Sequence, residues 1–190
     1  MSFELFKKVF FTLILIALGG AALSYIFIYH VHGRGVSAKD GWLFDIQGYH
    51  QGIRESKLTE KPLFLYLRRQ ACQRCIAFEY DYLNNPQIKR MLEDYVKVQV
   101  NIDTDRTHER FADQFNLNTY PSLFVMFDPE HHVSSYLVLE MNQIWVAQDT
   151  LQKGNFMPLS EASFSLSVTR ATILARKAAN MEESSGETPP

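Results

Sequence analysis

The chain has 190 residues, of which 46% are hydrophobic and 21% charged, and its formal net charge at pH 7 is −2. This length fits one ordinary domain plus an appendage, because domains usually contain about 100–200 residues. A nucleic-acid-binding protein normally carries a basic excess, so the charge balance argues against that class and we expect no nucleic-acid partner.

An uncharged apolar segment extends from Val9 to Val31. At about 1.5 Å per residue, a helix of these 23 residues can cross a bilayer core of about 30 Å. A cleaved signal peptide is the alternative, because two lysines precede the segment and small residues occur at 19–22. The apolar region of a signal peptide is usually about 7–15 residues long, whereas this one continues past the small residues. No polar face interrupts it, which disfavours a buried helix of a soluble domain. We predict a tail over 1–8 and a transmembrane anchor over 9–31.

Glycines after the anchor indicate a short linker over residues 32–43. Lys7 and Lys8 slightly favour a cytoplasmic N-terminus, although Arg34 and Lys39 flank the other end of the anchor. A working disulfide, for which the two cysteines described below are candidates, suits an oxidising compartment. We therefore expect a single-pass membrane protein whose globular part lies on the extracytoplasmic (periplasmic or lumenal) side.

The rest of the chain alternates extended and helical patterns. Leu63–Leu67 is a continuous apolar run, the pattern of a strand buried on both faces. Asn85 and Pro86 are typical of a helix N-cap and of the first helical position. The same reasoning predicts strands over 63–67, 96–102, 123–127 and 133–139, and helices over 44–57, 73–83, 87–95, 106–115 and 160–179. Residues 141–160 show no readable pattern. The polar, acidic segment 179–190 is expected to be disordered, which leaves a domain over 44–178.

Cys72 and Cys75 are the only cysteines of the chain. Two randomly placed cysteines would show this spacing roughly once in 100 chains. A structural zinc site usually needs four ligands, and no second cysteine pair is present. The six histidines show no ligand spacing with the cysteines, and residues 103–105 lack the glycine and glutamate of a calcium loop. The pair therefore indicates redox chemistry, and we predict no metal site and no cofactor.

Three segments together resemble the thioredoxin superfamily. They are the Cys72–Cys75 motif after the first strand, residues 98–103 with their acidic turn, and residues 119–122 before an apolar strand. Prolines at 62 and 86 bring the resemblance closer to the C-terminal domains of membrane thiol:disulfide interchange proteins. The resemblance implies an α/β thioredoxin-like fold, with a mixed central sheet flanked by helices, preceded here by a single transmembrane helix.

The chain departs from that family at two positions. Family members usually have a Trp before the first cysteine, where this chain has Ala71. Thioredoxins proper bury an acidic residue six positions before that cysteine, and Tyr66 stands there. The acid is thought to move a proton to or from the second cysteine. Its absence puts thioredoxin-like kinetics in doubt, but not exchange itself.

Thiol–disulfide exchange needs an accessible thiolate and a second thiol that resolves the mixed disulfide. Cys72 at a helix N-terminus would be the attacking thiolate, and Cys75, one turn inside the helix, the resolving thiol. Arg74 is a candidate for lowering the pKa of Cys72. Arg68 and Arg69 are further candidates, but for these two a solvated surface position is slightly favoured.

The loop at Tyr120 and Pro121 is the candidate substrate-binding site. The resemblance implies a cis peptide bond before Pro121, which would hold the Tyr120 backbone beside the disulfide, where a substrate strand can pair with it. The Tyr120 ring is as well suited to packing as to a substrate contact.

The leading hypothesis is a membrane-tethered thiol–disulfide oxidoreductase that acts on protein thiols or disulfides outside the cytoplasm, with a membrane-bound redox partner. The direction of electron flow stays open, since basic neighbours favour an oxidant and the resemblance favours a reductant. The alternative is a thioredoxin-fold binding or assembly module without redox turnover. Metal capture by the two thiols is a third hypothesis, with the least weight.

Overall fold

The computed structural model describes residues 19–20, 36–117, 119–128, 133–140, 142–148 and 156–185. It divides the chain into two compact units, Met1–Gly35 and Val36–Pro190. The predicted tail over 1–8 and anchor over 9–31 lie outside the described residues, except for Gly19 and Gly20. Within the described ranges, no helix is long and apolar enough to span a membrane.

Seven strands of the described residues form one mixed sheet in the order β1-β3-β2-β4-β5-β6-β7. β3 pairs in parallel with β1 and β2, whereas β2 pairs antiparallel with β4, and the sheet continues antiparallel to β7. The four predicted strands are confirmed as β2 to β5. The strands are β1 (Trp42–Phe44), β2 (Leu63–Arg68), β3 (Val96–Asn101), β4 (Ser122–Asp128), β5 (Val133–Glu140), β6 (Gln143–Val146) and β7 (Met157–Pro158).

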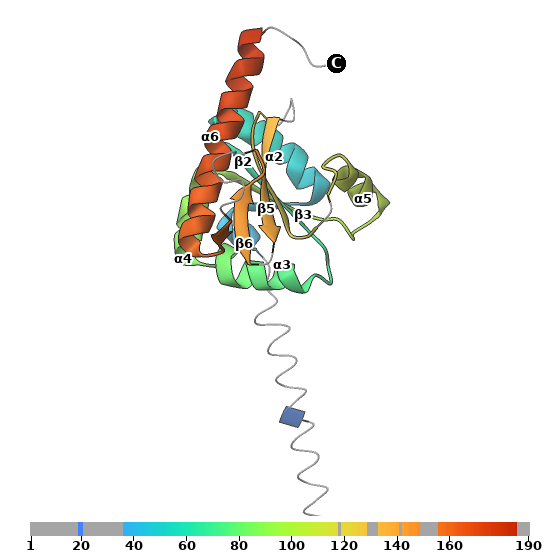
Figure 1. The fold of residues 1–190 in the computed structure, drawn as a ribbon. Coiled ribbons are helices and arrows are strands. Elements are labelled where there is room, and N and C mark those ends of the chain that lie inside the picture. The colour runs from blue at the N-terminus through green and yellow to red at the C-terminus, as the bar shows by residue number, and fades with distance from the viewer. Residues whose placement is uncertain are drawn as a thin grey trace, which may run out of the picture. The chain divides into compact units, whose positions relative to one another are not determined.

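Helices cover both faces of this sheet (Figure 1). One face packs against α3 (Gln73–Phe78), its π-helical continuation η3 (Glu79–Leu83), α4 (Pro86–Met91), η4 (Leu92–Asp94) and α6 (Glu161–Ser185). The opposite face packs against α2 (Asp45–Thr59) and α5 (Arg106–Asp113). A single 3₁₀ turn, η2 (Ala38–Asp40), precedes β1. All five predicted helices are confirmed, with the 73–83 helix divided between α3 and η3.

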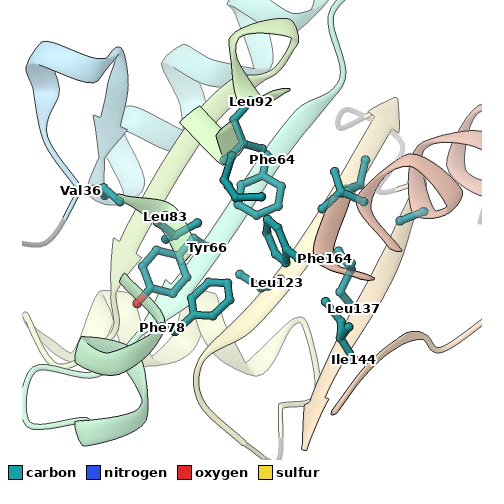
Figure 2. Packing of buried hydrophobic residues seen from close by; sticks show 14 of the residues in the cluster. Val36, Phe64, Tyr66, Phe78, Leu83, Leu92, Leu123, Leu137, Ile144 and Phe164 are labelled. Atoms are coloured by element: carbon teal, nitrogen blue, oxygen red, sulfur yellow. The ribbon is translucent and has the colours of Figure 1, made fainter. Parts of the chain in front are cut away.

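The central strand β2 contributes to the core on both sides. Phe64 and Tyr66 point toward α3 and α6, whereas the three leucines of Leu63–Leu67 point toward α2 and α5. All five side chains are fully buried, as the continuous apolar run predicts. Figure 2 shows Phe64 and Tyr66 beside Phe78 of α3 and Phe164 of α6. The helix that carries the cysteines is therefore held against the sheet by aromatic packing.

Side-chain caps fix where two helices begin. The Asn85 carboxamide oxygen accepts a hydrogen bond from the Gln87 amide at 2.8 Å, with Pro86 at the first helical position of α4. The Asp105 carboxylate accepts one from the Thr107 amide at 2.7 Å at the start of α5. These bonds satisfy amide groups that a helix leaves without partners in its first turn.

The segment predicted as a linker over 32–43 overlaps a strand. β1 pairs with β3 at the sheet edge, and the Trp42 ring lies edge-on to Phe64 and Tyr66 at centroid distances of 6.1 and 6.3 Å. Three residues are too few to show the period-2 alternation that identifies a strand. The linker prediction is therefore wrong for residues 42–43.

Three elements near the C-terminus also differ from expectation. Residues 141–160 gave no prediction, yet they contain β6 and β7, with the ring centroids of Trp145 and Phe156 4.6 Å apart. α6 continues to Ser185, whereas we expected it to end near residue 179 and the chain beyond to be disordered. Residues 186–190 lie outside the described part of the chain.

Candidate functional site

Cys72 and Cys75 form a disulfide at the junction between β2 and α3. Their Cα atoms are 5.2 Å apart. Cys72 is half-buried and precedes the first residue of α3, where its Sγ accepts a hydrogen bond from the Cys75 amide at 3.1 Å. Cys75 is fully buried on the inner side of the helix. Cys72 is thus partly open to solvent, whereas Cys75 is shielded from it.

The loop before β4 lies beside this junction. The peptide bond between Tyr120 and Pro121 is cis, as the resemblance implied. In the antiparallel pairing of β2 and β4, Leu67 is opposite Ser122, so the chain that leaves β2 toward Cys72 passes next to Pro121. The structure therefore brings together the predicted cysteine pair and the predicted substrate-binding loop.

Arg69, in the loop before the cysteines, contacts two other segments of the chain through Tyr120 and Asp103. Its guanidinium carbon lies 5.3 Å from the centre of the Tyr120 ring, and its Nε lies 3.5 Å from an Asp103 carboxylate oxygen. The other Asp103 oxygen accepts a hydrogen bond from the Gln70 amide at 2.9 Å. The Arg69 side chain is 52% exposed, which agrees with the solvated position that we favoured for it, and its two contacts also position the loop.

Arg68 does not occupy the solvated position that we favoured for it. Its side chain is 15% exposed, and its Nη1 lies 3.0 Å from Oε1 of Glu79. The same oxygen accepts a hydrogen bond from the Tyr66 hydroxyl at 2.7 Å. Tyr66, Arg68 and Glu79 thus form a largely buried polar cluster between the central strand and the helix that follows Cys72.

Burial dominates the ionisation of this cluster. It raises the pKa of Glu79, although the Tyr66 hydrogen bond and the Arg68 charge act in the opposite direction. It also raises the pKa of Tyr66, and the Glu79 charge adds to that rise. Glu79 is the only carboxylate among the described residues that is buried. Its backbone amide donates to the Cys75 carbonyl, so it lies one helical turn beyond Cys75.

A thioredoxin-like family model matches residues 45–129, which include both cysteines, Tyr120 and Pro121. The matched segment is thioredoxin-like, in agreement with the resemblance found in the sequence. None of the curated protein sequences matches it significantly.

Several solved thioredoxin-like structures are remotely similar to the chain. A poplar thioredoxin h is 12% identical, with 46% of this chain and 76% of that one covered and a TM-score of 0.40. The oxidised C-terminal domain of Neisseria meningitidis DsbD is 19% identical, with 44% and 76% covered and a TM-score of 0.38. A Thermus thermophilus thioredoxin is 14% identical, with 77% and 94% covered and a TM-score of 0.41.

In this thioredoxin-like domain a buried acid is present, but on a different element from the one we considered. Sequence reasoning found Tyr66 at the strand position and missed Glu79 on the helix. Two signals could have found it. Tyr66 and Arg68 are two positions apart on a strand, so they share a face, and Glu79 is four positions after Cys75, so it shares the inward face of the helix.

Arg74 lies in the first turn of α3 and is exposed. It lines a surface cavity together with Pro121, so it belongs to the same side of the molecule as the disulfide and the cis-proline loop. Within the described residues, no group of three or more histidine, cysteine or acidic side chains is arranged to hold a metal ion.

Proposed function

We propose that the chain is a membrane-tethered thiol–disulfide oxidoreductase that acts on protein cysteines outside the cytoplasm. The observation that carries the proposal is the pairing of a half-exposed Cys72 with a buried Cys75 beside a cis Pro121. An inert structural disulfide has no need of an accessible sulfur that accepts a helical amide. Such an amide stabilises a thiolate at Cys72.

In the reduced protein, the Cys72 thiolate attacks one sulfur of a substrate disulfide. A bond forms between Cys72 and that sulfur, the substrate bond breaks, and the other substrate sulfur leaves as a thiolate with the bonding electron pair. The Cys75 thiol then loses its proton and attacks Cys72 Sγ. The Cys72–Cys75 disulfide re-forms, and the substrate is released with both of its sulfurs reduced. The reverse sequence oxidises a dithiol.

We propose that the Glu79 carboxylate accepts the proton that the Cys75 thiol loses. The carboxyl group is buried one helical turn beyond Cys75 and is held in place by the Tyr66 hydroxyl and the Arg68 guanidinium. Because burial raises its pKa, the carboxylate is a better proton acceptor than an exposed glutamate. Cys75 has no solvent exposure, which makes a buried acceptor necessary for fast exchange.

The test of redox function uses the full chain in a neutral detergent. Equilibration with glutathione or dithiothreitol buffers, followed by acid quenching and mass counting of alkylated thiols, should show reversible two-electron cycling. A potential near about −120 mV would indicate an oxidant, and one near about −270 mV a reductant. Variants Cys72→Ser and Cys75→Ser should not cycle. A disulfide that resists every native redox buffer would instead indicate a binding or assembly module.

The tether and the compartment rest on the apolar segment from Val9 to Val31. The chain should stay in the membrane fraction after an alkaline carbonate wash and leave it only with detergent. After mild reduction of intact cells or spheroplasts, a membrane-impermeant maleimide should label Cys72. Release by carbonate would contradict the anchor, and labelling only after lysis would contradict the location.

A further inference from the structure

A cavity of about 560 Å³ opens beside the active-site helix. One wall is a face of α3 and η3 that carries Phe78, and the other is formed by Pro121, Leu159 and the turn between β5 and β6. The cavity therefore begins at the residue that the proposed function places next to an incoming substrate. Its position makes it the natural site for the substrate residues that flank the reactive cysteine.

Three charged side chains line this cavity: Arg74, Asp81 and Glu140. All three are exposed, and none forms an ion pair with another described residue. Arg74 lies in the first turn of α3, and Asp81 follows seven residues later, roughly 10 Å along a helix axis at about 1.5 Å per residue. With one positive and two negative side chains, the lining carries a net charge of −1.

We propose that this cavity makes the site selective for disulfides whose cysteine is flanked by a lysine or arginine. The proposal rests on the proposed function, because the substrate cysteine must first reach Cys72. In an extended substrate, a residue two positions from the cysteine lies about 6.6 Å farther along the strand. The aliphatic stem of a lysine or arginine there packs on the apolar walls, and its charged end reaches Asp81 and Glu140.

A glutamate at the same substrate position meets the two carboxylates instead. Partly exposed ion pairs are individually weak, so two of them together should change the rate of exchange by about threefold to tenfold. Selectivity of this kind acts on the encounter with substrate and is reduced by salt. Arg74, at the cysteine end of the helix, remains available to favour the Cys72 thiolate.

The test uses the full chain, reduced beforehand and held in neutral detergent. Each peptide substrate carries one cysteine in a mixed disulfide with 2-nitro-5-thiobenzoate, and a lysine, alanine or glutamate two positions away. The Cys72 thiolate attacks the peptide sulfur, a Cys72–peptide disulfide forms, and the coloured thiobenzoate leaves with the bonding pair. Cys75 loses its proton, attacks Cys72, and releases the peptide thiol.

We expect the lysine peptide to react about threefold to tenfold faster than the alanine peptide, and the glutamate peptide to react more slowly than either. The lysine-to-alanine ratio should fall toward one in the double variant Asp81→Asn, Glu140→Gln. It should be unchanged in Glu109→Gln, which removes an exposed carboxylate of α5. Circular dichroism establishes that each variant is folded.

Equal rates for the three peptides in the unmodified protein would overturn the selectivity while leaving the oxidoreductase in place. A preference for the glutamate peptide would also overturn it and would show that Arg74 decides the charge preference. If no peptide and no small disulfide reacts, the proposed function itself fails. A ratio that survives the double variant would show that other residues recognise the basic side chain.

Discussion

Replacing Glu79 by glutamine is the most informative single change in this protein. Glutamine keeps the shape of the side chain and an oxygen that accepts the Tyr66 hydrogen bond, but it removes the charge and the ability to take a proton. The change therefore separates two roles of the carboxylate, as a partner of Arg68 and as a proton acceptor for Cys75.

The stability effect follows from the direction of the pKa shift. Because burial raises the pKa of Glu79 above its unfolded value, the folded protein holds that proton more tightly than the unfolded chain. Stability then falls as pH rises from the unfolded pKa, about 4.3, through the folded value. Each unit of pKa difference corresponds to about 1.4 kcal/mol. Desolvation thus outweighs the pairing with Arg68, and Glu79→Gln should be more stable than the unmodified protein at pH 8.

The kinetic effect runs in the opposite direction. Loss of a positioned general base typically slows a proton transfer by about 10²–10⁴-fold. We expect about a hundredfold slower resolution of the mixed disulfide in Glu79→Gln near pH 7. In the unmodified protein this rate should rise with pH through the raised pKa of Glu79, whereas the variant should lack that rise.

Two assays decide the matter. Urea unfolding at pH 5 and pH 8 gives the stability difference, and rapid quenching with mass detection of the Cys72–substrate intermediate gives the resolution rate. Glu109→Gln is the matched control and should change neither. Tyr66→Phe removes a hydrogen bond that lowers the pKa of Glu79, so it should move the rate profile to higher pH. A Glu79→Gln variant that loses stability at pH 8 and resolves at the normal rate would refute the reasoning.

Three further outcomes are expected. Cys75→Ser should accumulate the Cys72–substrate disulfide without turnover, seen as a stable adduct by mass; rapid release of substrate would contradict the assignment of Cys72 and Cys75. Phe164→Ala removes a fully buried ring packed on Phe64 and Phe78. It should lower the free energy of unfolding in urea by about 3–5 kcal/mol. A loss below about 1 kcal/mol would show that α6 is not part of the core. Hydrogen bonds from the His108 side chain and from backbone amides lower the pKa of Asp105 to about 2. The contribution of Asp105 to stability is therefore present above its unfolded pKa and is lost as pH falls through about 2. An NMR titration that places the Asp105 pKa near its ordinary value would contradict this prediction.

Local patterns were sufficient for the central elements. The run Leu63–Leu67 predicted a strand buried on both faces, because an apolar side chain at every position is compatible only with cover on each side. Asn85 predicted the start of a helix, because its side chain bonds an amide two residues away. These features depend on contacts within a few residues of the chain.

Elements that depend on distant contacts were not predictable in the same way. β1 has only three residues, and its stability comes from pairing with β3 and from burial of Trp42. β7 has two residues and pairs with β6, more than ten positions earlier. The bond between Tyr66 and Glu79 joins residues 13 positions apart, on a strand and a helix whose relative placement is set by core packing.

The departure at Tyr66 is better understood as a relocation of the acid than as its loss. Where the family buries a carboxylate on the strand, this chain has a phenol whose hydroxyl reaches a carboxylate supplied by the active-site helix. The carboxylate of Glu79 is carried one helical turn beyond Cys75, on the same helical segment. Burying Glu79 is unfavourable for folding, as the direction of its pKa shift indicates. A group held in a protein against its own stability usually serves a function, which is why the stability and rate of Glu79→Gln should change in opposite directions.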